Sequence, residues 1–160
     1  MTSNRRQQRS AWPPALAQLG AIRFARRYYR FQEAVAFYRD LVGFVLCETF
    51  RDSYGSTGAI FALPDTTVTF EILQSPAPVE SAAQEPICLY FRDEGAMAAA
   101  RDRLVRAGVA MAPAHPYWRA TGAVCFLDPE GREVVLAPFV YGENEPDAGS
   151  ASGKHEAFDA

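Results

Sequence analysis

Residues 123–136 have the pattern of strand, tight turn and strand, and a weaker copy of this pattern lies 64 positions earlier in the chain. The segment reads AVCFLDPEGREVVL, with apolar residues on both sides of Asp-Pro-Glu-Gly. Proline fixes φ at one turn position and glycine tolerates a positive φ at another, so the four polar residues predict a turn. A shift of 64 residues places the later segment over the earlier one at three apolar pairs, Leu127 and Leu63, Val134 and Phe70, and Leu136 and Ile72. The repeat predicts a chain built from two copies of one unit.

The first unit, residues 20–74, has the patterns of one helix and four strands in the order βαβββ. The expected strands are 21–29, 44–50, 58–63 and 67–73, with a polar loop at 51–57 and a hairpin turn at 64–65. A helix is expected over 32–41, because Ala34, Phe37, Tyr38 and Leu41 have the spacing of one helical face. Gly43 is placed to end that helix as its C-cap.

The second unit, residues 85–141, repeats the same order after a proline-containing linker at 75–84. We expect a strand at 85–92, a helix at 94–107 closed by Gly108, a short strand at 109–112, a loop at 114–119, and then the hairpin. Residues 1–19 are expected to form a loose arm and residues 142–160 a disordered tail, which leaves a single domain at 20–141.

Composition narrows the class of protein further. The chain of 160 residues is 49% hydrophobic, which is ample for a core, and its formal net charge of −3 gives no electrostatic reason to expect a nucleic acid partner. It has no apolar run of membrane-spanning length and no apolar leader after its first arginines. The three cysteines are an odd number without metal-type spacing, and they predict buried, reduced thiols in a cytoplasmic protein.

Three segments, in this order, carry a family resemblance: AFYRDLVGF at 36–44, LVRAGV at 104–109 and LDPEGREVVL at 127–136. With them, the chain resembles the vicinal oxygen chelate superfamily of glyoxalases, bleomycin-resistance proteins and extradiol dioxygenases over about residues 22–141. RFAR at 23–26 and PYW at 116–118 are similar to a bacterial branch of that superfamily that is poor in metal ligands. The resemblance implies an α+β fold in which two βαβββ modules form a cupped, partly open mixed barrel around a ligand, and it implies a homodimer.

The resemblance also defines where a metal would be held. Metal enzymes of the superfamily take one side chain from the first strand and one from the last strand of each module. The corresponding positions here are Arg23, Glu71, Pro86 (or Ile87) and Val135, with Glu133 two residues before the last of them. Arginine has no lone pair to offer, and only Glu71 is clearly able to ligate. We therefore expect no metal and no other cofactor, and we hypothesise an Arg23–Glu71 ion pair in place of the metal.

Candidate ligand-binding residues follow from strand alternation and from one aromatic segment. Arg23 and Arg27 share one face of the first strand, where each is either an anchor for an anionic group or part of a surface ion pair. Tyr117 and Trp118 could stack on a planar ligand or simply plug the mouth of the barrel. The remaining candidates are Phe61, Glu71, Cys88, Tyr90, His115 and Arg119, with Thr69 and Leu73 beside Phe61.

Three functions remain open at this stage. The first is a metal-independent protein of the glyoxalase and bleomycin-resistance type that binds or sequesters an aromatic or planar metabolite or antibiotic. The second is a metal-independent isomerase, cyclase or lyase of secondary metabolism with His115, Glu71 or Tyr90 as acid or base. The third is a metal-dependent lyase or dioxygenase with displaced ligands such as Glu71, Glu133 and His115.

Overall fold

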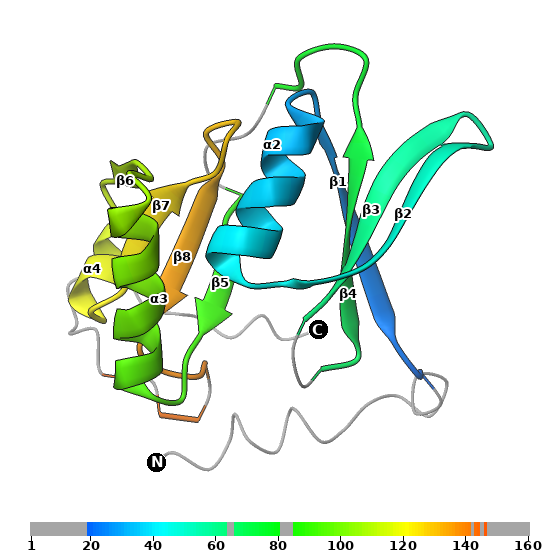
Figure 1. Ribbon diagram of the computed structural model, residues 1–160. Coiled ribbons are helices and arrows are strands. Elements are labelled where there is room, and N and C mark those ends of the chain that lie inside the picture. Colours follow the sequence, from blue (N-terminus) through cyan, green and yellow to red (C-terminus); the bar gives the residue numbers. More distant parts are fainter. Residues whose placement is uncertain (1–18, 64–65, 81–84, 142, 145, 147–160) are drawn as a thin grey trace, which may run out of the picture.

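The computed structural model describes residues 19–63, 66–80, 85–141, 143–144 and 146, and within them the βαβββ unit occurs twice (Figure 1). The first unit consists of β1 (Ile22–Tyr28), α2 (Phe31–Ala36), its wider π-helical continuation η2 (Phe37–Val42), β2 (Val45–Ser53), β3 (Ser56–Ala62) and β4 (Val68–Gln74). The second consists of β5 (Ile87–Tyr90), α3 (Glu94–Arg106), β6 (Met111–Ala112), the short α4 (Pro116–Ala120), β7 (Val124–Leu127) and β8 (Glu133–Ala137).

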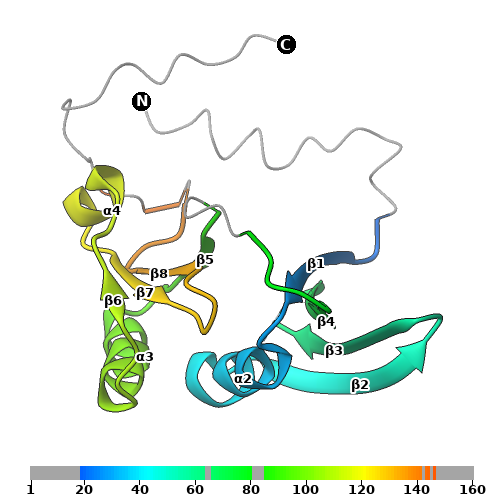
Figure 2. The same cartoon turned by 90° about the horizontal axis from the view of Figure 1, so that it is seen from above.

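Each unit forms its own four-stranded mixed sheet. Sheet one has the order β1-β4-β3-β2 and sheet two the order β5-β8-β7-β6, and in both the first and last strands of the unit pair in parallel. Phe24 lies opposite Phe70 in one sheet, and Ile87 lies opposite Val134 in the other, so the repeat in the sequence is a repeat in register. The sheets do not close on each other, and the predicted α+β fold with an open, cupped barrel is confirmed (Figure 2).

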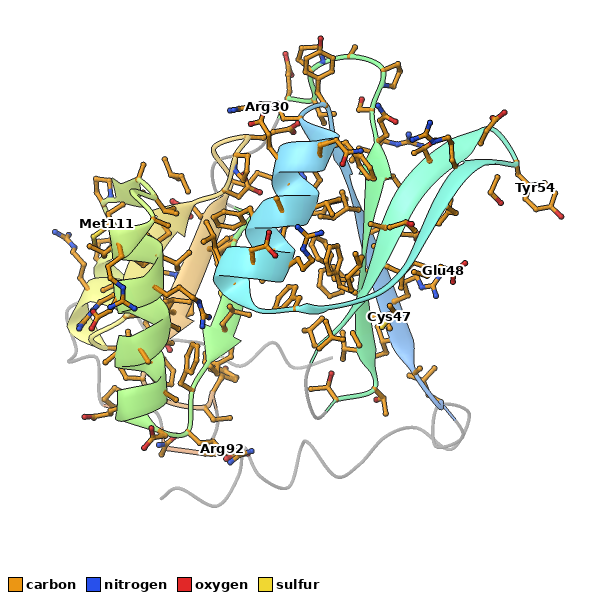
Figure 3. All side chains as sticks on the ribbon, in the orientation of Figure 1. Arg30, Cys47, Glu48, Tyr54, Arg92 and Met111 are labelled. Atoms are coloured by element: carbon orange, nitrogen blue, oxygen red, sulfur yellow. The ribbon has the colours of Figure 1, made fainter. Side chains whose placement is uncertain are left out.

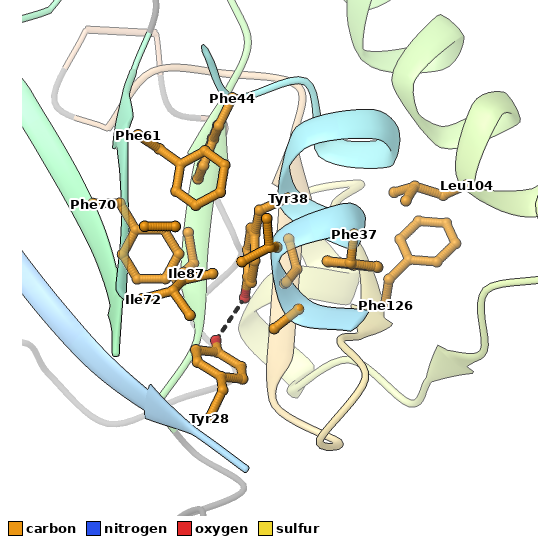
Figure 4. Close-up of a cluster of buried hydrophobic side chains, with 14 of the residues drawn as sticks. Tyr28, Phe37, Tyr38, Phe44, Phe61, Phe70, Ile72, Ile87, Leu104 and Phe126 are labelled. Carbon is orange, nitrogen blue, oxygen red and sulfur yellow. Dashed lines mark hydrogen bonds between the residues drawn. The ribbon is translucent and has the colours of Figure 1, made fainter. Parts of the chain in front are cut away.

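One hydrophobic core joins the two units. The helix of the first unit lies between the sheets, and Figure 4 shows Phe37 pointing towards Leu104 and Phe126 of the second unit. Phe70 is at the centre of the side of this core that belongs to sheet one. Its ring centroid lies 5.0 Å from those of Phe24 and Tyr38, 6.1 Å from that of Phe44 and 6.3 Å from that of Phe61. The predicted buried helix positions Ala34, Phe37 and Tyr38 are in this core, and Leu41 packs against it.

A buried carboxylate fastens the β7–β8 turn to the first unit. Asp128 is 5% exposed, and its Oδ2 accepts hydrogen bonds from the hydroxyls of Tyr28 at 2.8 Å and Tyr38 at 3.0 Å. Its Oδ1 accepts from the backbone N–H groups of Glu130 and Arg132, both at 2.9 Å. The Arg132 guanidinium lies 4.5 Å from the Tyr28 ring centroid and donates to the carbonyl of Arg27 at 2.9 Å. We call Tyr28, Tyr38, Asp128 and Arg132 the Asp128 network.

The tyrosines of this network predict a loss of stability at high pH. Burial, and then the nearby Asp128 charge, raise the pKa of Tyr28 to about 12, and burial raises the pKa of Tyr38 well above its ordinary value. Because a tyrosine in the unfolded chain ionises near pH ~10, the stabilisation is complete below that pH and is lost as the pH rises towards 12. Each tyrosine contributes a slope of up to about 1.4 kcal/mol per pH unit.

Urea unfolding between pH 8 and 11 measures this effect. The unfolding free energy of the wild type should fall more steeply than that of a Tyr28→Phe, Tyr38→Phe double variant, because only the wild type has the two tyrosines whose pKa is raised in the folded state. The cysteines titrate equally in both proteins and therefore do not affect the comparison. Equal slopes for the two proteins would contradict the prediction.

Several expectations need correction. The loop expected at 51–57 is mostly strand, because Tyr54 and Gly55, with φ of 50° and 76°, make a tight turn between β2 and β3. The loop expected at 114–119 contains α4. Cys47 is exposed rather than buried, since it lies on the outermost strand of sheet one at a break in the strand register (Figure 3), whereas Cys88 is half-buried and Cys125 is buried.

Other expectations are confirmed or fall outside the described residues. The helix ends at Gly43, with φ of 95°, and α3 ends before Gly108, with φ of 72°. Arg26 lies on the same face of the edge strand β1 as Phe24, and its Nη2 donates to the Glu85 carbonyl at 2.7 Å. Residues 1–18 of the arm expected at 1–19, the hairpin turn at 64–65, part of the linker (81–84) and most of the expected tail lie outside the described residues. In the part of the chain that the structure describes, no helix is long and apolar enough to cross a membrane.

Candidate functional site

The face of sheet one that points away from the helix is the first candidate surface. Strand register places on it Arg23, Ala25 and Arg27 of β1, Thr69, Glu71 and Leu73 of β4, and Ile60 of β3. The Nε of Arg23 donates to Thr69 Oγ1 at 3.4 Å, which is consistent with both side chains lying on this face. We call these seven residues the open face of sheet one. All three of its β1 residues are exposed.

The ion pair expected between Arg23 and Glu71 does not form. Parallel pairing puts Ala25, not Arg23, opposite Glu71, so the guanidinium lies beside Thr69 instead. Within the described residues, no salt bridge of 4.0 Å or less joins Glu71 to Arg23 or Arg27. The open face of sheet one therefore carries two cations and one carboxylate that do not neutralise one another by direct contact.

The corresponding face of sheet two is covered by aromatic side chains. Cys88, Cys125, Val135 and Ala137 lie on it, and Tyr117, Trp118 and Phe139 pack against them. The Trp118 ring centroid lies 4.8 Å from that of Tyr117, 6.3 Å from that of Tyr90 and 6.5 Å from that of Phe139. Tyr90 itself lies 5.6 Å from Phe139 and is 38% exposed. We call Tyr90, Tyr117, Trp118 and Phe139 the aromatic cluster.

The short helix α4 holds Tyr117 and Trp118 over the sheet. His115 precedes it, and His115 Nδ1 accepts a hydrogen bond from the Tyr117 N–H at 3.2 Å. At the other end, the Thr121 hydroxyl donates to the Tyr117 carbonyl at 3.1 Å, and Gly122 turns the chain with φ of 75°. A loop was expected here, but the sequence holds two signals for this helix, Pro116 at its first position and Gly122 just after its end. His115 and Arg119 are exposed, and His115 acts locally as a helix cap.

The cysteines beside the aromatic cluster are held as neutral thiols. Burial, followed by the Glu133 charge, raises the pKa of Cys125 to about 11, and the same two causes raise the pKa of Cys88. A thiol with a raised pKa is a poor nucleophile near neutral pH. These residues therefore fit an apolar lining rather than covalent chemistry.

Two residues differ from the sequence-based assignment of the site. Phe61 was expected to line the ligand side, but it is fully buried opposite Phe70 in the helix-facing core, because strand alternation puts Ile60 rather than Phe61 beside Glu71. Phe139 was not selected, although it closes the aromatic cluster. The sequence holds one indication of this role, which is that Phe139 is an aromatic residue two positions after the final strand.

The residues at the metal-ligand positions do not fit a metal. The register confirms that the two units correspond, since Ala25 pairs with Glu71 as Cys88 pairs with Val135. The four positions therefore hold Arg23, Glu71, Pro86 and Val135, of which only the glutamate has a suitable donor atom. Among the described residues, no three His, Cys, Asp or Glu side chains lie together in a way that could hold a metal ion.

Comparison with known proteins agrees with this architecture. The profile of the Glyoxalase/Bleomycin resistance protein/Dioxygenase superfamily matches residues 22–136, and the chain belongs to that superfamily. No curated protein matches the chain.

Solved structures share the fold at low identity. The YycE protein of unknown function from Bacillus subtilis has a TM-score of 0.67 and 24% identity, over 79% of this chain and 96% of its own. An antibiotic-binding protein from a Streptomyces species, TnmS3, has a TM-score of 0.57 and 21% identity, over 76% and 96%. A FosX fosfomycin resistance protein from Listeria monocytogenes, bound to Mn(II) and a phosphonic acid, has a TM-score of 0.58 and 16% identity, over 78% and 94%.

Proposed function

We propose that this protein binds a planar aromatic small molecule without a metal ion. The observation that carries the proposal is the aromatic cluster on the face of sheet two that corresponds to the open face of sheet one. Tyr90 and Trp118 are only partly buried there, and their rings offer flat apolar area with polar edges. A metabolite or an antibiotic that is sequestered rather than converted fits such a surface.

Metal independence is supported by the chemistry of the donors. Arg23, Pro86 and Val135 supply no lone pair at three of the four ligand positions, which leaves Glu71 without partners to complete a coordination shell. The fold alone favours neither metal-dependent nor metal-independent binding, because one similar structure is of an antibiotic-binding protein and another contains Mn(II).

The proposal includes a cytoplasmic homodimer. The exposed residues Arg23, Ala25 and Arg27 leave one side of the open face of sheet one accessible in a single chain. A second copy would cover this face and enclose a ligand between sheets. Light scattering of the purified protein that gave the mass of one chain would contradict this part of the proposal.

A catalytic role is the second candidate, and Glu71 is the residue that favours it. Its carboxylate is half-buried and has no ion pair within the described residues, so it is available to take a proton from a ligand. A metal-independent isomerase, cyclase or lyase would use it in that way. Turnover that is lost in Glu71→Gln while binding is retained would favour this enzyme over a binding protein.

Removing Trp118 tests the binding proposal. Calorimetry with 2-naphthamide, a neutral planar probe, should give an affinity that falls about 10-fold in Trp118→Ala, because a ring contact of about 0.5–1.5 kcal/mol and its apolar area are both lost. Tyr54→Ala is the matched control, since Tyr54 is fully exposed at the tip of the β2–β3 hairpin (Figure 3). Chelator should change neither the affinity nor the melting temperature.

Two outcomes would contradict the proposal. The first is equal binding by Trp118→Ala and wild type, with circular dichroism showing that both are folded. The second is a stoichiometric metal whose removal by chelator abolishes binding.

A further inference from the structure

We propose that the ligand is a monoanion, of the aryl carboxylate class, whose charged group binds to Arg23 and Arg27 on the open face of sheet one. This inference rests on the proposed function, because it adds a charged group to the planar molecule proposed for the aromatic cluster. It assigns to the two arginines a role that neither the fold nor the metal-ligand positions require.

The two arginines are placed as a pair. They lie four residues apart on one face of β1, and about 13 Å therefore separates their Cα atoms at ~3.3 Å per residue. The residue between them on this face is Ala25, which has only a methyl group and is exposed. A small, exposed residue flanked by two long cationic side chains leaves room for a ligand group between the guanidiniums.

The guanidiniums also keep most of their donors available. Arg23 donates one hydrogen bond, from Nε to Thr69, at the long distance of 3.4 Å. Arg27 has no side-chain hydrogen bond or ion pair with any described residue, although its carbonyl accepts from Arg132. A guanidinium has five N–H donors in a planar fork that matches a carboxylate, so both side chains can bind an anion without giving up a strong contact.

Charge on this face favours one negative charge over two. Glu71 lies on the neighbouring strand, directly opposite Ala25, and leaves a local balance of two cations against one carboxylate. Beyond these seven residues, Glu48 lies on the same side of the sheet, but it is three strands from β1, at the far edge. A monoanionic ligand neutralises the remaining positive charge, whereas a phosphate dianion would exceed it and meet Glu71.

A pair of isosteric probes tests the inference. By calorimetry at low ionic strength, 2-naphthoate should bind about 10-fold more tightly than 2-naphthamide, because only the carboxylate forms charge-assisted hydrogen bonds. Arg23→Gln and Arg27→Gln should each weaken 2-naphthoate by about 5-fold and leave 2-naphthamide unchanged. Glu71→Gln should act in the opposite direction and tighten 2-naphthoate by about 3-fold, since it removes a like charge. Arg106→Gln is the matched control, because this exposed arginine on α3 makes the same change of charge on another element.

The outcomes separate this inference from the proposed function. Equal binding of the two probes, both weakened by Trp118→Ala, would overturn the anion site and leave the aromatic site standing. Binding of 2-naphthoate that depends on Arg23 but not on Trp118 would support the anion site and overturn the aromatic one. A loss of affinity in Arg106→Gln as large as that in Arg23→Gln would show a general charge effect and overturn the inference.

Discussion

Asp128→Ala is expected to lower the free energy of unfolding by about 3–5 kcal/mol, because several buried donors lose their acceptor together. The substitution removes all four hydrogen bonds that the buried carboxylate accepts, from two tyrosine hydroxyls and from the backbone N–H groups of Glu130 and Arg132. The guanidinium of Arg132, which is 7% exposed, keeps its contacts with the Tyr28 ring and the Arg27 carbonyl in this variant. Buried donors without an acceptor cost far more than the loss of an exposed ion pair.

Urea unfolding at neutral pH measures this loss. Asp102→Ala is the control, because its pair with Arg101 is partly exposed on α3 and should contribute less than about 1 kcal/mol. Tyr38→Phe should fall between the two, since it removes one hydroxyl from the network and leaves the carboxylate in place. If Asp128→Ala lost no more than Asp102→Ala, the Asp128 network would not be what fastens the β7–β8 turn to the first unit.

Phe70→Ala is the second substitution with a large expected effect, again about 3–5 kcal/mol. Phe70 is fully buried, and four aromatic rings surround it within 5.0–6.3 Å, so truncation leaves a cavity that rigid neighbours cannot fill. Since domains are stable by only about 5–15 kcal/mol, this change could leave much of the protein unfolded at 37 °C.

Phe70→Leu and Tyr54→Ala are the controls for this prediction. The first keeps most of the apolar volume and should lose clearly less stability, and the second removes an exposed ring and should stay within about 0.5 kcal/mol of wild type. A loss below about 1.5 kcal/mol for Phe70→Ala would mean that the core relaxes around the gap. Because Tyr38 contacts both Phe70 and Asp128, the two large substitutions are not expected to be additive.

The functional consequence of this fold lies in how its two sheets are used. The same βαβββ unit presents arginines and a carboxylate on one sheet and a cluster of aromatic rings on the other. A metal ion would need donor atoms at corresponding positions of both units, and the second unit has proline and valine there. The open face of sheet one and the aromatic cluster instead suit a ligand with one charged end and one planar apolar end, as we propose.

Sequence reasoning performed well where the signal is local. The hairpin at 123–136 and its copy predicted the order of strands, and alternation along 22–28 correctly separated Arg23 and Arg27 from Phe24 and Tyr28. The sequence also showed which side chains stand at the metal-ligand positions, because an arginine or a valine side chain has no lone pair for a metal in any conformation. The helix at 94–106 was predicted to within one residue, since its apolar spacing lies within it and Gly108 follows closely after its last residue.

The sequence by itself thus determined the repeat, the α+β class and the strand alternation. It also determined that three of the four positions that the family resemblance assigns to metal ligands have side chains without a lone pair. Only the tertiary structure decided that Arg23 meets Thr69 rather than Glu71, that Phe61 faces the helix, and that Asp128 is buried against Tyr28 and Tyr38. The physical reason is the distance along the chain: Asp128 and its tyrosines are 90 to 100 residues apart. A one-residue difference in strand register also moves a side chain to the other face. Periodicity within one strand carries no information about contacts between distant residues or about the register between strands.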